Sequence, residues 1–150
     1  VAELEAAYGP PSTDGFGSAV FFEALGEQDF EAAAKRWYRS FVGPKWEAQG
    51  EAAWMGSWSE AYRRVGGAVH DIVAELSAIT VFPTRMQTDL LLNPSEGVEA
   101  ARGALAGAFD PAEVTDVRAW NLGDGEAMSG ILIAGRRGDG AATFVVLLMD

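Results

Sequence analysis

The chain has 150 residues, of which 49% are apolar and 22% charged, a composition that is typical of one folded domain and excludes a disordered chain. It contains no cysteine, which excludes disulfides, thiolate catalysis and cysteine-ligated metal centres. The net charge of −11 disfavours nucleic acid or an anionic membrane as a partner, because phosphates would be repelled. We therefore expect a single domain over residues 1–150 with neither kind of partner.

The N-terminal half is predicted to be mainly helical. Residues 2–8 can form two helical turns, which Gly9 would end. The apolar run Ala19–Leu25 fits either a strand or a helix, because its periodicity does not decide between them. A helix is then predicted by four apolar residues at steps of four, three and four: Phe30, Ala34, Trp37 and Phe41.

A second helix is predicted after Gly43-Pro44, which would end the first. It is indicated by three aromatic residues at four-residue spacing, Trp54, Trp58 and Tyr62. Gly66-Gly67 would break or kink this helix, and an apolar face at helical spacing then continues to about Ser77.

Proline and turn residues divide the next part of the chain. Residues 79–92 are rich in β-branched and apolar side chains around Pro83, which cannot donate to a central ladder, so we predict an edge or bulged strand. Asn93-Pro94 predicts a turn. Ser95 is a suitable N-cap for a helix that Asp110-Pro111 would end.

The C-terminal third is predicted to form an antiparallel meander. Its three strand-like runs, 114–122, 128–134 and 142–149, are separated by glycine-rich turns, which is a strong hairpin signal. The last run is apolar at every position from Phe144 to Met149. A strand with one face in water would alternate, so we expect this strand to lie inside the sheet with both faces covered.

This element order predicts an α+β domain in which N-terminal helices pack on one face of a C-terminal antiparallel sheet. In outline, the order of elements resembles that of the NTF2-like and cystatin-like folds, in which a curved sheet wraps a long helix. The resemblance implies a curved, cone-like sheet in this chain.

The candidate binding residues lie in or beside the tryptophan-rich segment. Four of the five tryptophans fall between residues 37 and 58, at spacings typical of a core, although the same rings could line a pocket. His70, the single histidine, could act as a base, but adjacent residues of a helix point about 100° apart, so Asp71 is poorly placed to orient it. The predicted ligand-binding residues are Trp54, Trp58, Tyr62, His70 and Asp71. We predict no catalytic residue, metal site or cofactor.

The acidic charge and the lack of a catalytic motif favour a non-enzymatic protein-binding module of the inhibitor, immunity or adaptor type, with a basic protein as its partner. The alternative is a small-molecule binding or catalytic domain, NTF2-like in outline, with an aromatic pocket for a small apolar ligand. A third hypothesis is that surface carboxylates mimic a nucleic acid. The simplest explanation of the negative charge is that it serves solubility alone. The absence of cysteine and nine arginines against two lysines lead us to expect a bacterial, cytoplasmic protein.

Overall fold

The computed structural model describes residues 2–67 and 69–150. Across these residues the chain forms seven helices and five strands, which confirms the α+β class. In chain order, the elements are α1 (Ala2–Tyr8), β1 (Gly17–Ala24), α2 (Phe30–Val42), α3 (Lys45–Gln49), α4 (Glu51–Met55), β2 (Ser59–Arg63), α5 (Ile72–Ser77), α6 (Thr84–Leu92), α7 (Val98–Phe109), β3 (Val114–Gly123), β4 (Ser129–Arg137) and β5 (Ala141–Met149).

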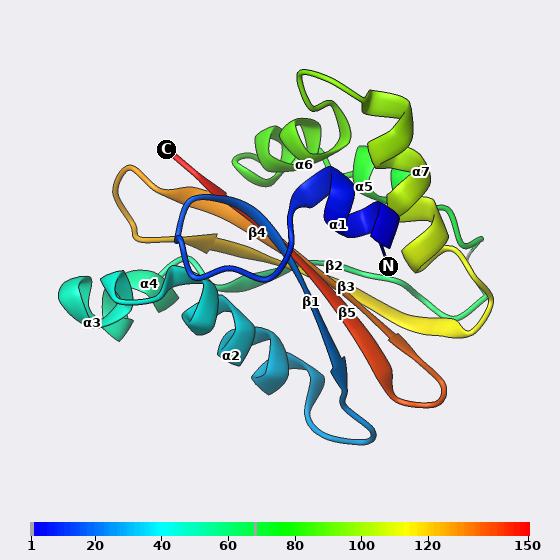
Figure 1. Cartoon of the computed structure of the whole chain (residues 1–150), viewed down its shortest axis with the longest axis horizontal. Coiled ribbons are helices and arrows are strands. Elements are labelled where there is room, and N and C mark those ends of the chain that lie inside the picture. Colours follow the sequence, from blue (N-terminus) through cyan, green and yellow to red (C-terminus); the bar gives the residue numbers. More distant parts are fainter. Residues whose placement is uncertain (1, 68) are drawn as a thin grey trace.

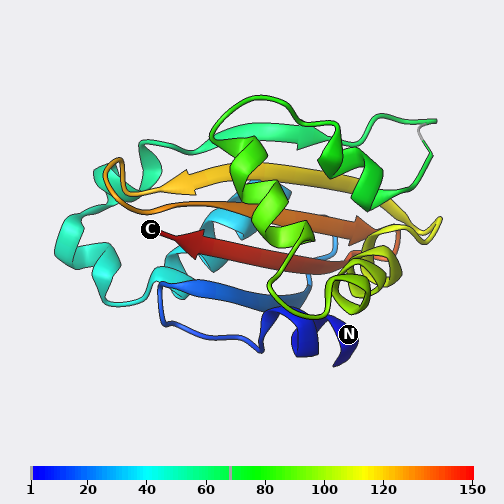
Figure 2. The ribbon, with the colours of Figure 1, turned by 90° about the horizontal axis from the view of Figure 1, so that it is seen from above.

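The five strands form one antiparallel sheet in the order β1-β5-β4-β3-β2 (Figure 2). Strands β3, β4 and β5 follow one another through two hairpins, which confirms the predicted C-terminal meander. Two earlier strands extend this meander on its two sides. Strand β1 pairs with β5, and β2 pairs with β3 across the connection that contains α5, α6 and α7.

Helices cover both faces of the sheet, so the expectation of cover on one face was too narrow (Figure 1). Helices α2, α3 and α4 lie on one face, and α1, α5, α6 and α7 lie on the other. The last strand explains why two layers are needed. Phe144 and Val146 point into the first layer while Val145 and Leu147 point into the second, and all four are buried. The predicted interior position of this strand is confirmed.

Helix α2 forms where its apolar spacing predicts it. Asp29 caps its N-terminus by accepting a hydrogen bond from the backbone N–H of Ala32 at 2.9 Å. The helix ends at Gly43, whose φ of 67° is a left-handed conformation that favours glycine. A Cβ at this position would lie 2.6 Å from the carbonyl oxygen of Thr13, so the close approach of the two backbones also requires glycine.

The predicted helix through Trp54, Trp58 and Tyr62 is wrong. The chain forms two five-residue helices that meet at Gly50, which has a φ of 94°, and residues 59–63 then form strand β2. Pairing of this segment with β3 and packing of the aromatic rings outweigh the four-residue period. The run that fitted either a strand or a helix, Ala19–Leu25, is strand β1 up to Ala24.

The predicted strand over residues 79–92 is also wrong, because Thr84–Leu92 forms helix α6. Proline is tolerated at a helix start, so Pro83 precedes this helix without disrupting it. The next helix, α7, begins at Val98, with Gly97 rather than Ser95 at its N-cap. Its end before Asp110 is confirmed.

Candidate functional site

The tryptophans form an aromatic layer between the sheet and helices α2, α3 and α4. Trp58 stacks on Trp120 and on Tyr38, with 5.4 and 5.8 Å between ring centroids. Trp54 is fully buried, stacks on Trp46 at 6.4 Å, and donates its indole N–H to a backbone carbonyl at 3.0 Å. These rings contact one another, as the rings of a hydrophobic core do.

The outer side of α2 places a cation near three of these rings. The pairs, with the distance from the cation to the ring centroid, are Lys35–Trp58 (5.8 Å), Arg36–Trp37 (5.7 Å) and Arg39–Trp46 (5.9 Å). Two of the cations also have carboxylate partners, because Arg36 lies 3.0 Å from Glu23 and Arg39 lies 3.6 Å from Glu47. The three helices of this layer and their connections therefore carry nearly balanced charge, with four bases and three acids in residues 30–58.

A buried ion pair joins the end of β2 to α5 on the other face of the sheet. Nη2 of Arg64 lies 2.6 Å from Oε1 of Glu75, and the two side chains are only 1% and 9% exposed. Arg64 also donates to the carbonyl oxygens of Phe109 and Val114, at 2.8 and 3.0 Å. The hydroxyl of Tyr62 donates to the other oxygen of the Glu75 carboxylate. Arg64 and Glu75 thus connect β2, α5, α7 and β3.

Burial and hydrogen bonding shift the pKa values of this cluster. Burial, and then the hydrogen bond to Glu75, raise the pKa of Tyr62 to about 12. Burial disfavours the charged form of Glu75, but the hydrogen bonds from Arg64 and Tyr62 outweigh it and hold the Glu75 pKa below its usual value. Burial raises the pKa of Asp110 although its carboxylate accepts a hydrogen bond from the N–H of Ile72 at 2.7 Å. At neutral pH, Tyr62 is therefore protonated and Glu75 ionised.

His70 and Asp71 lie beside this cluster, just before α5. The carboxylate of Asp71 caps that helix by accepting from the N–H of Ala74 at 3.2 Å, and the N–H of Asp71 donates to Glu75 at 3.1 Å. Nδ1 of His70 lies 3.2 Å from the carbonyl oxygen of Pro111. The described contacts of both residues are therefore with neighbouring backbone or with the ion pair.

The structure divides the five residues predicted to bind a ligand between the two faces of the sheet. Trp54 and Trp58 belong to the aromatic layer. On the opposite face, Tyr62 and Asp71 contact Glu75 of the ion pair, and His70 contacts the carbonyl oxygen of Pro111. Sequence reasoning missed the ion pair itself. If residues 59–63 are assigned to a strand, the two-residue period places Arg64 on the same face as Tyr62. This period is the sequence signal that could have indicated the ion pair.

Helix α6 turns a polar side toward the sheet. Thr84, Gln87 and Thr88 are at most 3% exposed. The hydroxyl of Thr84 donates to the side-chain oxygen of Asn121 at 2.6 Å, and the amide of Gln87 donates to the hydroxyl of Ser129 at 2.7 Å. Oε1 of Gln87 is buried without a hydrogen-bond partner among the described residues. The inner side of the first two turns of α6 is therefore polar and incompletely paired.

The exposed side of the same helix carries Met86 and Leu90 beside the ion pair Arg85–Asp89. We call four exposed apolar side chains, two just before α6 and two within it, the α6 ridge: Val81 (69% exposed), Phe82 (67%), Met86 (53%) and Leu90 (45%). Met86 and Leu90 are four residues apart and share one side of the helix. A helix at a protein surface normally buries its apolar side. Helix α6 buries Leu91 and Leu92 in this way but leaves Met86 and Leu90 exposed.

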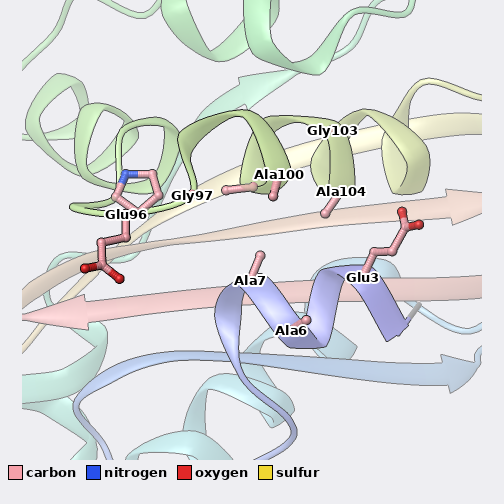
Figure 3. A pocket seen from close by; sticks show the side chains of 10 residues that line it. Glu3, Ala6, Ala7, Glu96, Gly97, Ala100, Gly103 and Ala104 are labelled. Atoms are coloured by element: carbon pink, nitrogen blue, oxygen red, sulfur yellow. The ribbon is translucent and has the colours of Figure 1, made fainter.

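Two hollows continue from the α6 ridge toward α1. The first, of about 340 Å³, lies between α1 and α6, and Leu90 and Met149 are among its lining residues. The second, of about 570 Å³, lies between α1 and α7 (Figure 3). Both are lined by Ala7 and Pro94, so the two hollows are adjacent, and we call them together the α1 groove.

The helical layer that contains the α1 groove is acidic, and two of its acids, Glu3 and Glu96, line the groove itself. Apart from Glu75, which pairs with Arg64, residues 2–9 and 71–110 contain seven acids and two bases. The acids are Glu3, Glu5, Asp71, Asp89, Glu96, Glu99 and Asp110, and the bases are Arg85 and Arg102. This face therefore combines exposed apolar side chains with negative charge.

Neither a family of proteins, nor a curated protein, nor a solved structure matches this chain. In the part of the chain that the structure describes, no group of three or more histidine, aspartate or glutamate side chains could hold a metal ion. None of the described helices has both the length and the apolar character that crossing a membrane requires.

Proposed function

We propose that this protein is a non-enzymatic protein-binding module that binds a basic protein through the acidic helical layer of α1, α5, α6 and α7. The α6 ridge is the observation that carries this proposal. Single exposed apolar residues are common on protein surfaces, but large apolar side chains that are exposed together mark sites of interaction. The ridge supplies the apolar centre of such a site, and the surrounding acids supply its charged rim.

The mixed burial pattern of α6, with polar side chains buried and Met86 and Leu90 exposed, supports a functional reason for the ridge. Burial removes the polar side chains of Thr84, Gln87 and Thr88 from water, which is unfavourable unless hydrogen bonds replace those to water. Leaving Met86 and Leu90 in water also forgoes the stabilisation that their burial would provide. Departures from the usual pattern that lower stability are expected at functional sites.

The negative charge of this layer supports a basic protein as the partner. The acidic layer would attract a basic protein surface, accelerate its association and disfavour acidic competitors. An inhibitor, immunity or adaptor protein uses such a surface without chemistry of its own. The state of the polar cluster is consistent with this role, because a tyrosine with a pKa of about 12 and a carboxyl with a lowered pKa do not exchange protons near neutral pH.

A small-molecule function is the second candidate, and one observation favours it. A hollow of about 260 Å³ between α2 and α4 is lined by Lys35, Arg39 and Trp46 among others, which suits a small aromatic anion. Quenching or shifting of the tryptophan fluorescence by an aromatic carboxylate such as benzoate would support this candidate. Unchanged fluorescence at millimolar benzoate would count against it.

The double substitution Met86→Glu/Leu90→Glu tests the principal proposal. Both side chains are about half-exposed, so the variant should fold, yet it places two charges in the apolar centre of the binding surface. We expect the tagged wild-type protein to retain a partner from host lysate at low salt, and the variant to bind that partner at least about tenfold more weakly.

The matched control is Val65→Glu/Val69→Glu, which adds the same charge at two exposed valines outside the α6 ridge. This control should bind like the wild type, and high salt should weaken binding in both. Equal retention of the partner by the ridge variant and the wild type would contradict the proposed surface.

A further inference from the structure

We propose that the α1 groove receives an amphipathic, basic α-helix of the partner. This inference rests on the proposed function and specifies which segment of the basic partner occupies the acidic layer. It is carried by the groove, by the α6 ridge that continues it, and by the distribution of acids around it.

The hydrogen-bonding state of the groove favours a helix over an extended segment. Its walls are formed mainly by α1, α6, α7 and the connection before α7, and the rest of the lining comes from β1 and β5. The nearby edge of the sheet is partly closed, since the N–H of Val20 donates to the carbonyl oxygen of Gly9 at 3.1 Å and the hydroxyl of Ser18 donates to that of Tyr8 at 2.7 Å. An extended segment would find few backbone partners here, whereas a helix satisfies its own.

The shape of the groove fits side chains from a helix. Figure 3 shows Ala6 and Ala7 of α1 opposite Ala100 and Ala104 of α7. These small side chains leave space that larger apolar residues of a partner helix can fill at steps of three and four residues. Gly103 extends this space, because a Cβ at that position would meet no atom within 4 Å.

The charges around the groove specify where the partner helix is basic. Glu3 and Glu96 lie at opposite ends of the hollow between α1 and α7 (Figure 3). The helical rise from Gly97, beside Glu96, to Ala104 is about 10 Å. A partner helix therefore matches the groove when it carries two lysines or arginines about two turns apart beside its apolar stripe. A second copy of this chain is a poor occupant, because it would bring the same acids to the interface.

Nuclear magnetic resonance with a synthetic peptide tests this inference. The probe is a leucine–lysine peptide of about 18 residues, or five turns, with leucines at helical spacing and lysines on the other side. We expect its addition to shift the backbone amide signals of residues 3–8 and 90–104. A leucine–glutamate peptide with the same leucine positions should bind at least about tenfold more weakly, because its charges are repelled.

A groove-filling substitution provides the matched comparison. Gly103→Leu fills the hollow between α1 and α7 and should weaken binding of the leucine–lysine peptide at least about tenfold. Gly107→Leu is the control, since Gly107 is also an exposed helical glycine with open space at its Cβ but lines a different hollow. Both substitutions replace glycine within a helix, so neither should destabilise the fold.

Three results would overturn the inference: peptide-induced shifts confined to α2, α3 and α4, equal affinity for both peptides, or equal affinity of the two glycine variants. The capture experiment with Met86→Glu/Leu90→Glu distinguishes failure of this inference from failure of the proposed function. If Met86→Glu/Leu90→Glu still abolishes capture of the natural partner, the binding surface stands and the helical occupant is wrong. If capture is also insensitive to that variant, both proposals fail.

Discussion

Substitution of Glu75 by glutamine is expected to lower the free energy of unfolding by about 3 kcal/mol. The change keeps the shape of the side chain but removes the charge that compensates Arg64, whose side chain is 1% exposed. Arg64 would remain buried because it also holds the carbonyl oxygens of Phe109 and Val114. Urea denaturation at neutral pH measures the loss.

The control for this substitution is Glu60→Gln, which removes a partner from the surface pair Arg63–Glu60. That pair has a similar N–O distance of 2.7 Å, but its side chains are 53% and 38% exposed. Because water and salt screen this surface ion pair, we expect Glu60→Gln to lower the free energy of unfolding by less than about 1 kcal/mol. Similar losses in the two variants would show that burial does not govern the strength of these ion pairs.

The effect of Glu75→Gln should depend on pH with a definite sign. The pKa of Glu75 in the folded protein lies below its ordinary value of 4.5, so its charge stabilises the fold above that value. This stabilisation is lost as the pH falls through the folded pKa, and the difference between wild type and variant should shrink there. The raised pKa of Asp110 acts in the opposite direction, because ionisation of that carboxyl costs more in the folded protein. A difference that grows on acidification would contradict this account.

Substitution of Trp54 by alanine is expected to lower the free energy of unfolding by about 3–5 kcal/mol. The ring is fully buried, stacks on Trp46 and meets Tyr38 edge-on at 6.4 Å, so its removal leaves a cavity in the aromatic layer. Trp54→Phe keeps part of the ring volume and should cost less. Thermal or urea unfolding of the two variants gives the comparison. Unchanged stability in Trp54→Ala would mean that the ring is dispensable for the core and is free to serve a ligand.

The C-terminal sheet was predictable because local signals and tertiary structure agree there. Glycine-rich turns separate β3, β4 and β5, and the uniformly apolar run from Phe144 identifies an interior strand. Helix α2 was predictable for the same reason, since the apolar stripe of Phe30, Ala34 and Phe41 is the side that it buries.

The errors arose where tertiary contacts oppose the local pattern. Trp58 and Tyr62 are four residues apart, yet Trp58 packs in the aromatic layer and Tyr62 packs on the opposite face from within β2. In α6, polar Thr84 and Thr88 face the sheet while Met86 faces water, so an assignment based on buried apolar residues fails. The candidate binding surface was missed for the same reason, because its signal is the exposure of Met86 and Leu90 on a helix that was not predicted.

Site-specific photo-crosslinking tests the location of the binding surface most directly. A photo-reactive amino acid at position 86 lies on the α6 ridge, whereas one at position 47 lies on α3 in the opposite helical layer, where the Glu47 side chain is 84% exposed. After irradiation of producing cells, we expect position 86 to form an adduct with a protein through a basic segment, and position 47 to form none. Adducts from position 47 without any from position 86 would contradict the proposal that this acidic layer binds the partner.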